Sequence, residues 1–182
     1  MLTITVKSRE VFDEKTSTFH TIKGETLKLE HSLISISKWE SKWKKPYLTT
    51  QEKTDEEAID YIRCMTLTKP QNDIVYSVLT KDNLRDIRDY IQSPMSATTF
   101  PEGSEGSGGG VIQSYTSEEI YALMVIYNIP FSCQKWHINR LLTLIRVCDI
   151  KQSPPKKLSQ SEILRRNHDL NEQRRAQMNT KG

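Results

Sequence analysis

The N-terminal residues 1–31 alternate apolar and polar positions, which is the pattern of strands with one buried face. Leu2, Ile4 and Val6 share one face of the first run. Further runs of this kind follow at residues 10–12, 18–22 and 26–30. The residues between the runs, Gly24 among them, have the composition of turns. We therefore predict a β-meander, a small antiparallel sheet of three or four strands whose apolar face needs a cover.

From Ser32 onward, the apolar positions recur every three or four residues, which is the period of a helix packed on one side. Ser32 and Thr80 are suited to begin helices, and three capping boxes mark further starts, at residues 54–57, 116–119 and 159–162. We expect Ser132 to cap the central helix, which has a broad apolar face. The helix after Thr80 should turn three side chains inward, those of Leu84, Ile87 and Ile91. Residues 32–150 are thus predicted to form a helical body that covers the sheet, an α+β arrangement.

Five of the seven glycines fall within residues 93–114, where they are interleaved with Ser and Glu. This composition predicts a flexible loop, of the kind that is inserted into a domain or becomes ordered on binding. The glycines lack the spacing and the lysine of a phosphate-binding loop, so we do not expect phosphate binding there.

The C-terminal end differs from the rest of the chain in charge and in apolar content. Residues 151–182 contain eight Lys or Arg and three Asp or Glu, a net charge of +5, whereas residues 1–150 carry a net charge of −2. Large apolar residues are too few in the basic segment to build a core. We therefore divide the chain into a body, residues 1–150, and a basic arm, residues 151–182, which should be helical from about residue 160 to residue 178.

The arm carries the residues that we expect to bind a partner. A helix with an incomplete apolar face folds against another polypeptide, and its arginines can meet acidic side chains there. The predicted partner-binding residues are Ile163, Leu164, Arg165, Arg166, Leu170, Arg174 and Arg175. The two arginine pairs lie nine residues apart, so they point to roughly opposite sides of a helix. Nucleic-acid binding by the arm stays open, although three acidic residues of the arm dilute its positive field.

A second candidate contact is the aromatic and basic stretch at residues 38–48, where Trp39 and Trp43 lie one helical turn apart. Aromatic and basic side chains together are used to stack bases and to neutralise phosphates. The alternative is that both indoles anchor this helix to the body. Leu33 and Ile36 continue the same apolar face, which favours the anchoring role.

Motifs for catalysis and for cofactor binding are not found in the chain. It contains no G-x-S-x-G, H-E-x-x-H or Walker sequence. Cys133 and His137 lie one helical turn apart, but no second pair completes a metal site. We therefore expect no enzyme activity, no metal and no cofactor, and we expect the three cysteines to be free thiols. No run of eighteen apolar residues occurs, so a membrane span is not predicted.

Several strings of the sequence are distinctive. They read SISKWESKW with KPYL at residues 35–48, SATTF at 96–100, NIPF with WH at 128–137, and RN, LN and QRRAQ within 166–177. These strings resemble small proteins from the structural and tail-assembly gene blocks of tailed bacteriophages, some of which are tail assembly chaperones. The resemblance extends from about residue 29 to the C-terminus.

The resemblance implies a non-catalytic protein of the host cytoplasm that binds other phage tail proteins during tail assembly. The implied partners are the tape-measure protein or the tail-tube protein, and self-association is compatible with the same role. Two alternatives stay open. One is a structural virion subunit, such as a head–tail adaptor or a tail component, whose arm inserts into a neighbouring copy. The other is a nucleic-acid-binding protein that uses the basic arm.

Overall fold

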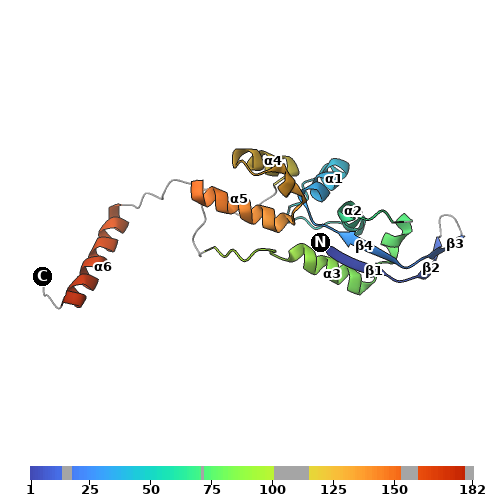
Figure 1. Ribbon diagram of the computed structural model, residues 1–182, viewed down its shortest axis with the longest axis horizontal. Helices are drawn as coiled ribbons and strands as arrows, with labels where there is room; N and C mark the ends of the chain where they lie inside the picture. Colours follow the sequence, from blue (N-terminus) through green and yellow to red (C-terminus); the bar gives the residue numbers. More distant parts are fainter. Residues whose placement is uncertain (14–17, 71, 101–114, 153–159, 179–182) are drawn as a thin grey trace. The chain divides into compact units, whose positions relative to one another are not determined.

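The structure is a computed structural model that describes five stretches of the chain, residues 1–13, 18–70, 72–100, 115–152 and 160–178. Strands β1 to β4 come first, and helices α1 to α6 follow with the short 3-10 helices η1 and η2 (Figure 1). The predicted α+β class is confirmed. The chain divides into two compact units, residues 1–150 and residues 151–182.

The strands form two antiparallel ladders of two strands each, which corrects the predicted sheet of three or four strands. β1 (Leu2–Val6) pairs with β4 (Glu25–Leu29), and β2 (Arg9–Asp13) pairs with β3 (Thr18–Ile22). Leu2 lies opposite Leu29, and Arg9 lies opposite Ile22, so both ladders keep the same register along the same two segments of chain. The ladders are therefore the two halves of one interrupted hairpin, and not a meander.

The interruption explains why the prediction was wrong. Gly24 lies between β3 and β4, and Lys7 and Ser8 lie between β1 and β2. At both places the strand pairing is interrupted, but the chain does not reverse its direction. A glycine within a strand pattern can mark either a turn or a break in the ladder. The alternation of apolar residues is the same in both cases, so the sequence could not distinguish them.

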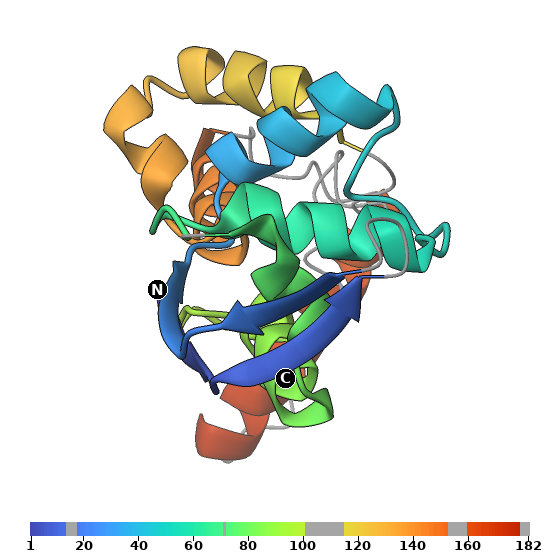
Figure 2. The ribbon, with the colours of Figure 1, turned by 90° about the vertical axis from the view of Figure 1, so that its right-hand side faces the viewer.

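Only the half of the hairpin that contains β1 and β4 has a buried face among the described side chains. The buried residues are Ile4, Val6, Leu27 and Leu29, and they are at most 4% exposed. α3 (Lys81–Gln92) packs beside β1 (Figure 2). In β2 and β3, by contrast, Phe12 and Phe19 are exposed, and their rings lie in contact across the ladder with centroids 5.0 Å apart and planes tilted by 55°.

Four predicted helix starts are confirmed. Ser32 caps α1 (Leu33–Trp43), Thr54 caps α2 (Asp55–Met65), Thr80 caps α3, and Thr116 caps α4 (Ser117–Ile126). In each case the side-chain oxygen of the cap accepts the backbone N–H three residues later. The two capping boxes predicted within the body are complete, because Glu57 and Glu119 accept the N–H of their caps in return. Thr80 and Asn83 form a third one at the start of α3.

Two predictions about the helices are wrong. Ser132 does not cap the central helix, because it lies within η2 (Phe131–Lys135) and α5 (Ile138–Gln152) begins later. The N–H of Ile138 donates to the carbonyl oxygen of His31 at 2.8 Å, so a distant segment fixes this start. Leu84 of α3 is 37% exposed, whereas Ile87 is buried as predicted.

The core of the body lies between the hairpin and the helices. α1 packs against α2, α4 and η2, and α2 packs against η1 (Asp73–Val78). Large side chains that are almost fully buried there include Trp39, Tyr61, Met65, Met124 and Leu141. The predicted glycine-rich loop falls mostly on residues 101–114, outside the described residues. The cysteines Cys64, Cys133 and Cys148 are free. Across the described stretches, every helix is too short or too polar to cross a membrane.

Candidate partner-binding arm

The arm contains α6 (Gln160–Met178), a helix of 19 residues. The prediction of a helix from about residue 160 to residue 178 is confirmed. Ser159, which we expected to open its capping box, lies outside the described residues. α6 holds all seven predicted partner-binding residues.

The side chains of α6 are exposed wherever the structure describes them. Leu164 is 65% exposed, Leu170 is 39% exposed and Met178 is 74% exposed. The four arginines of the predicted site are exposed as well. A single helix of this length is only marginally stable in water, because most helical stability in proteins comes from packing of an apolar face. α6 therefore presents apolar side chains that a partner can bury.

The apolar residues of α6 lie on one side of the helix, whereas the arginines surround it. At about 100° per residue, Leu164, Leu170 and Met178 fall within an arc of about 120°. Arg174 falls inside the same arc, and Arg165 lies on the opposite side of the helix. The apolar side chains thus define one docking face, and the four arginines are spread around the helix together with three acidic residues.

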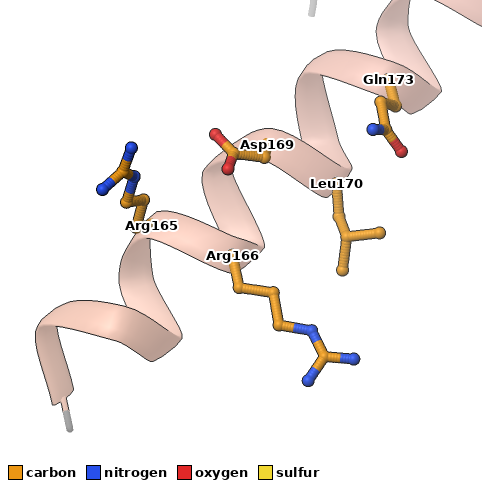
Figure 3. Close-up of a pocket in the computed structure, with 5 residues that line it drawn as sticks. All are labelled: Arg165, Arg166, Asp169, Leu170 and Gln173. Carbon is orange, nitrogen blue, oxygen red and sulfur yellow. The ribbon is translucent and has the colours of Figure 1, made fainter. Parts of the chain in front are cut away.

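A shallow hollow on α6 shows how these side chains are arranged. It is lined by Arg165, Arg166, Asp169, Leu170 and Gln173, all from this one helix. In Figure 3, Arg166 and Leu170 extend toward the same side, and Arg165 lies on another side with Asp169. Binding sites for small molecules are concave and mostly enclosed, so a hollow on a single helix is better suited to a protein surface. Guanidinium groups beside a leucine suit a partner that offers an apolar groove with carboxylates at its edge.

The second candidate contact has a different environment. Trp39 is 1% exposed, and its Nε1 donates to the carbonyl oxygen of Glu57 at 2.9 Å. Trp43 is half-buried, and its Nε1 donates to a carboxylate oxygen of Asp60 at 2.8 Å. Both indoles thus hold α1 against α2. Trp39 is not available to a partner.

Two of the four lysines of the same stretch are engaged by carboxylates of α2. Lys42 contacts Asp60 with 2.5 Å between Nζ and Oδ1, and Lys45 contacts Glu57 with 2.6 Å between Nζ and Oε1. Burial alone would raise the pKa of Asp60, but hydrogen bonds from Lys42 and Trp43 outweigh it and hold that pKa below its usual value. These contacts neutralise part of the positive charge of the stretch, whereas Lys38 and Lys44 are exposed.

A buried glutamate was not singled out from the sequence. Glu40 is 7% exposed, and its two carboxylate oxygens accept the backbone N–H groups of Tyr47 and Ser117, at 2.8 and 2.7 Å. The signal in the sequence was a charged residue beside Trp39 on the apolar face of its helix. Both oxygens already bind donors, so the arrangement suits a structural role.

A buried pair of histidines was also missed. His31 and His137 have ring centroids 5.0 Å apart, and both rings are buried. Nδ1 of His31 lies 2.5 Å from the hydroxyl of Tyr61. Nδ1 of His137 accepts the N–H of Asn139, so the proton sits on Nε2, which donates to the carbonyl oxygen of Tyr90 at 3.0 Å. No pattern in the sequence indicates this pair, because its members are more than a hundred positions apart.

Burial keeps both histidines neutral near pH 7. Burial and the nearby His137 lower the pKa of His31 to about 3. Burial also lowers the pKa of His137. Imidazoles that are buried and bound in this way hold α3 and α5 to the β4–α1 junction, and they are not placed to exchange protons with a substrate.

Within the described stretches, no three His, Cys, Asp or Glu side chains are grouped so that they could hold a metal ion. Comparisons of the chain with models of protein families, with curated proteins and with solved structures find no match.

Proposed function

We propose that this chain is a non-catalytic assembly factor of a tailed bacteriophage, similar to a tail assembly chaperone, that acts in the host cytoplasm. It uses α6 to bind another tail protein, such as the tape-measure or tail-tube protein. The observation that carries the proposal is the exposure of Leu164, Leu170 and Met178 on one side of a helix that also presents four arginines. The resemblance of the sequence to tail-assembly proteins supports the choice of partner.

The expected mode of binding is a helix in a groove. Leu164 and Leu170 insert into an apolar groove of the partner, as the spaced apolar anchors of such helices do. Arg174 lies between the anchors around the helix and meets a carboxylate at the edge of the groove. Docking would bury the apolar face that α6 now exposes and would stabilise the helix.

The test is co-purification of tagged full-length chain with the tape-measure and tail-tube proteins expressed beside it. We expect the double variant Leu164→Asp and Leu170→Asp to lose the partner. Arg174→Glu should weaken binding at least tenfold, whereas Arg165→Glu, which changes the charge equally on the opposite side, should retain it. Unchanged binding by the double leucine variant would contradict the proposal. Circular dichroism of each variant checks that the body stays folded.

The four exposed arginines favour one other function, nucleic-acid binding. That function predicts that the affinity for DNA or RNA falls steeply with salt, with a slope near the number of phosphates neutralised. It also predicts equal losses for Arg165→Glu and Arg174→Glu, because phosphate contacts respond to charge on any side. A structural virion subunit is distinguished by mass spectrometry of purified particles, which would contain the chain. An assembly factor would be absent from them.

A further inference from the structure

The outer face of α4 is apolar although it is exposed. All seven residues from Ile120 to Ile126 are apolar or aromatic. Ile120 and Met124 are fully buried against the body. On the opposite side, Val125 is 60% exposed, Ile126 is 64% exposed, and Ala122 is exposed between them. A helix that is apolar on all sides is normally buried on all sides, so this face is suited to a partner.

The apolar surface continues beyond the end of α4. Phe131 of η2 is 54% exposed, and its ring centroid lies 6.1 Å from that of Tyr121. Tyr121 is a neighbour of Val125 on the helix surface, because residues four apart face the same way. Ala122, Val125, Ile126 and Phe131 thus form one surface, which we call the α4–η2 face. Clustered exposed apolar side chains of this kind mark interaction sites.

The charge beside this face is negative. Glu118 and Glu119 are exposed in the first turn of α4, and its last turn has no basic residue. Glu118 lies on the same side of the helix as Ala122 and Val125, since these residues are spaced by four and three positions. An occupant of the α4–η2 face therefore needs apolar side chains and, about two turns away along the axis, a positive charge.

The arm of this same chain has that chemistry. We infer that the α4–η2 face of one copy binds α6 of a second copy, with Leu164 and Leu170 against Val125, Ile126 and Phe131. Arg166 and Arg174 each lie one turn from Leu170, on either side of it along the axis. When α6 lies with Leu170 nearer to Glu118 than Leu164 is, Arg174 extends beyond Leu170 toward the carboxylate of Glu118, whereas Arg166 stays between the two leucines. The inference rests on the proposed role of α6 as a docking helix.

Self-docking would have a consequence for the proposed function. The same face of α6 would be used for a second copy and for a tail protein, so the two contacts exclude each other. Binding of a tail protein should therefore dissociate the self-associated form. Until then, the exposed leucines of α6 would be covered by another copy.

The test uses sedimentation of full-length protein over a wide range of concentration. We expect the wild-type chain to self-associate and two variants to be monomeric. One variant carries Val125→Asp and Ile126→Asp, and the other carries Leu164→Asp and Leu170→Asp. Mixing the two variants should restore a complex of one copy of each, because one still has the arm and the other still has the face. A midpoint temperature of thermal unfolding equal to that of the wild type would show that the body of each variant is intact.

Three results would overturn the inference. The wild-type chain could be monomeric at every concentration, the variant of the α4–η2 face could self-associate like the wild type, or the mixture could fail to form the complex. The charge contact has its own check. Glu118→Arg should weaken self-association. Mixing this variant with a second variant that carries both Arg166→Glu and Arg174→Glu should restore association, because the charges of the contact are then reversed on both sides. The face variant should still co-purify with tail proteins, so failure of this inference is distinguishable from failure of the proposed function.

Discussion

The carboxylate of Glu40 accepts the backbone N–H of Ser117, 77 positions later in the chain, with 2.7 Å between Oε2 and the nitrogen. Ser117 is the first residue of α4, where N–H groups lack partners within the helix and negative charge is favoured. The other carboxylate oxygen accepts the N–H of Tyr47. One buried side chain therefore joins α1, the loop after it and the start of α4.

We expect Glu40→Gln to lower the free energy of unfolding by about 2 kcal/mol, because one backbone N–H then faces an amide NH₂ and loses its acceptor. Urea denaturation measures the change. Glu52→Gln removes the same charge at an exposed position, and it should change stability by less than about 0.5 kcal/mol. Equal effects of the two substitutions would show that the buried hydrogen bonds of Glu40 contribute nothing.

Stability should fall as the pH drops below 6.5, the ordinary pKa of histidine. The pKa of His31 is about 3 in the folded chain, compared with its ordinary value of 6.5. As the pH falls, the unfolded chain therefore binds a proton at His31 before the folded chain does, and this favours unfolding. The contribution of His31 is complete above pH 6.5 and is lost toward pH 3, by about 1.4 kcal/mol per pH unit. His137 acts in the same direction.

Urea denaturation between about pH 7.5 and pH 5 separates the histidines from the carboxylates, because carboxylates with a lowered pKa, such as those of Glu57 and Asp60, act only below about pH 5. The substitution His168→Gln removes an exposed histidine of α6 and serves as the matched control. A stability that does not change over this range would rule out a neutral buried His31.

Asn139 ties the end of α3 to α5. Its side-chain amide donates to the carbonyl oxygens of Ile91 and Ser93, at 3.0 and 2.8 Å. We expect Asn139→Ala to cost about 1–2 kcal/mol in unfolding free energy, because both carbonyls lose a donor. Asn139→Asp has the same shape but places a carboxylate against two carbonyls, so it should cost more than alanine. The reverse order in thermal denaturation would contradict this geometry.

α6 should exchange its amide hydrogens much faster than the body does. Its described side chains are exposed, and a single helix opens readily in water. Hydrogen–deuterium exchange of dilute protein should show rapid exchange over residues 165–178 and strong protection in α5. Protection of α6 should appear at high concentration if a second copy covers it. Strong protection of α6 in dilute protein would contradict the exposure seen here.

The sequence by itself determined the features that depend on neighbours within one or two helical turns. Thr54 with Glu57 and Thr116 with Glu119 form capping boxes because each bond joins residues three positions apart. The bounds of α6 were predictable for the same reason. Its exposed apolar and charged side chains could be identified from their helical spacing and from the charge of the segment. The candidate partner-binding residues could thus be chosen without knowledge of the fold.

Only the tertiary structure decided which distant segments meet. The pairing of β1 with β4 depends on residues 19 to 27 positions apart, and the start of α5 depends on the carbonyl oxygen of His31. The apolar run from Ile120 to Ile126 has no polar side, so its pattern could not tell which side packs against the body. The contact of Glu40 with Ser117 and the exposure of Val125 were set when the body folded, because hydrophobic burial and long-range hydrogen bonds depend on proximity in space.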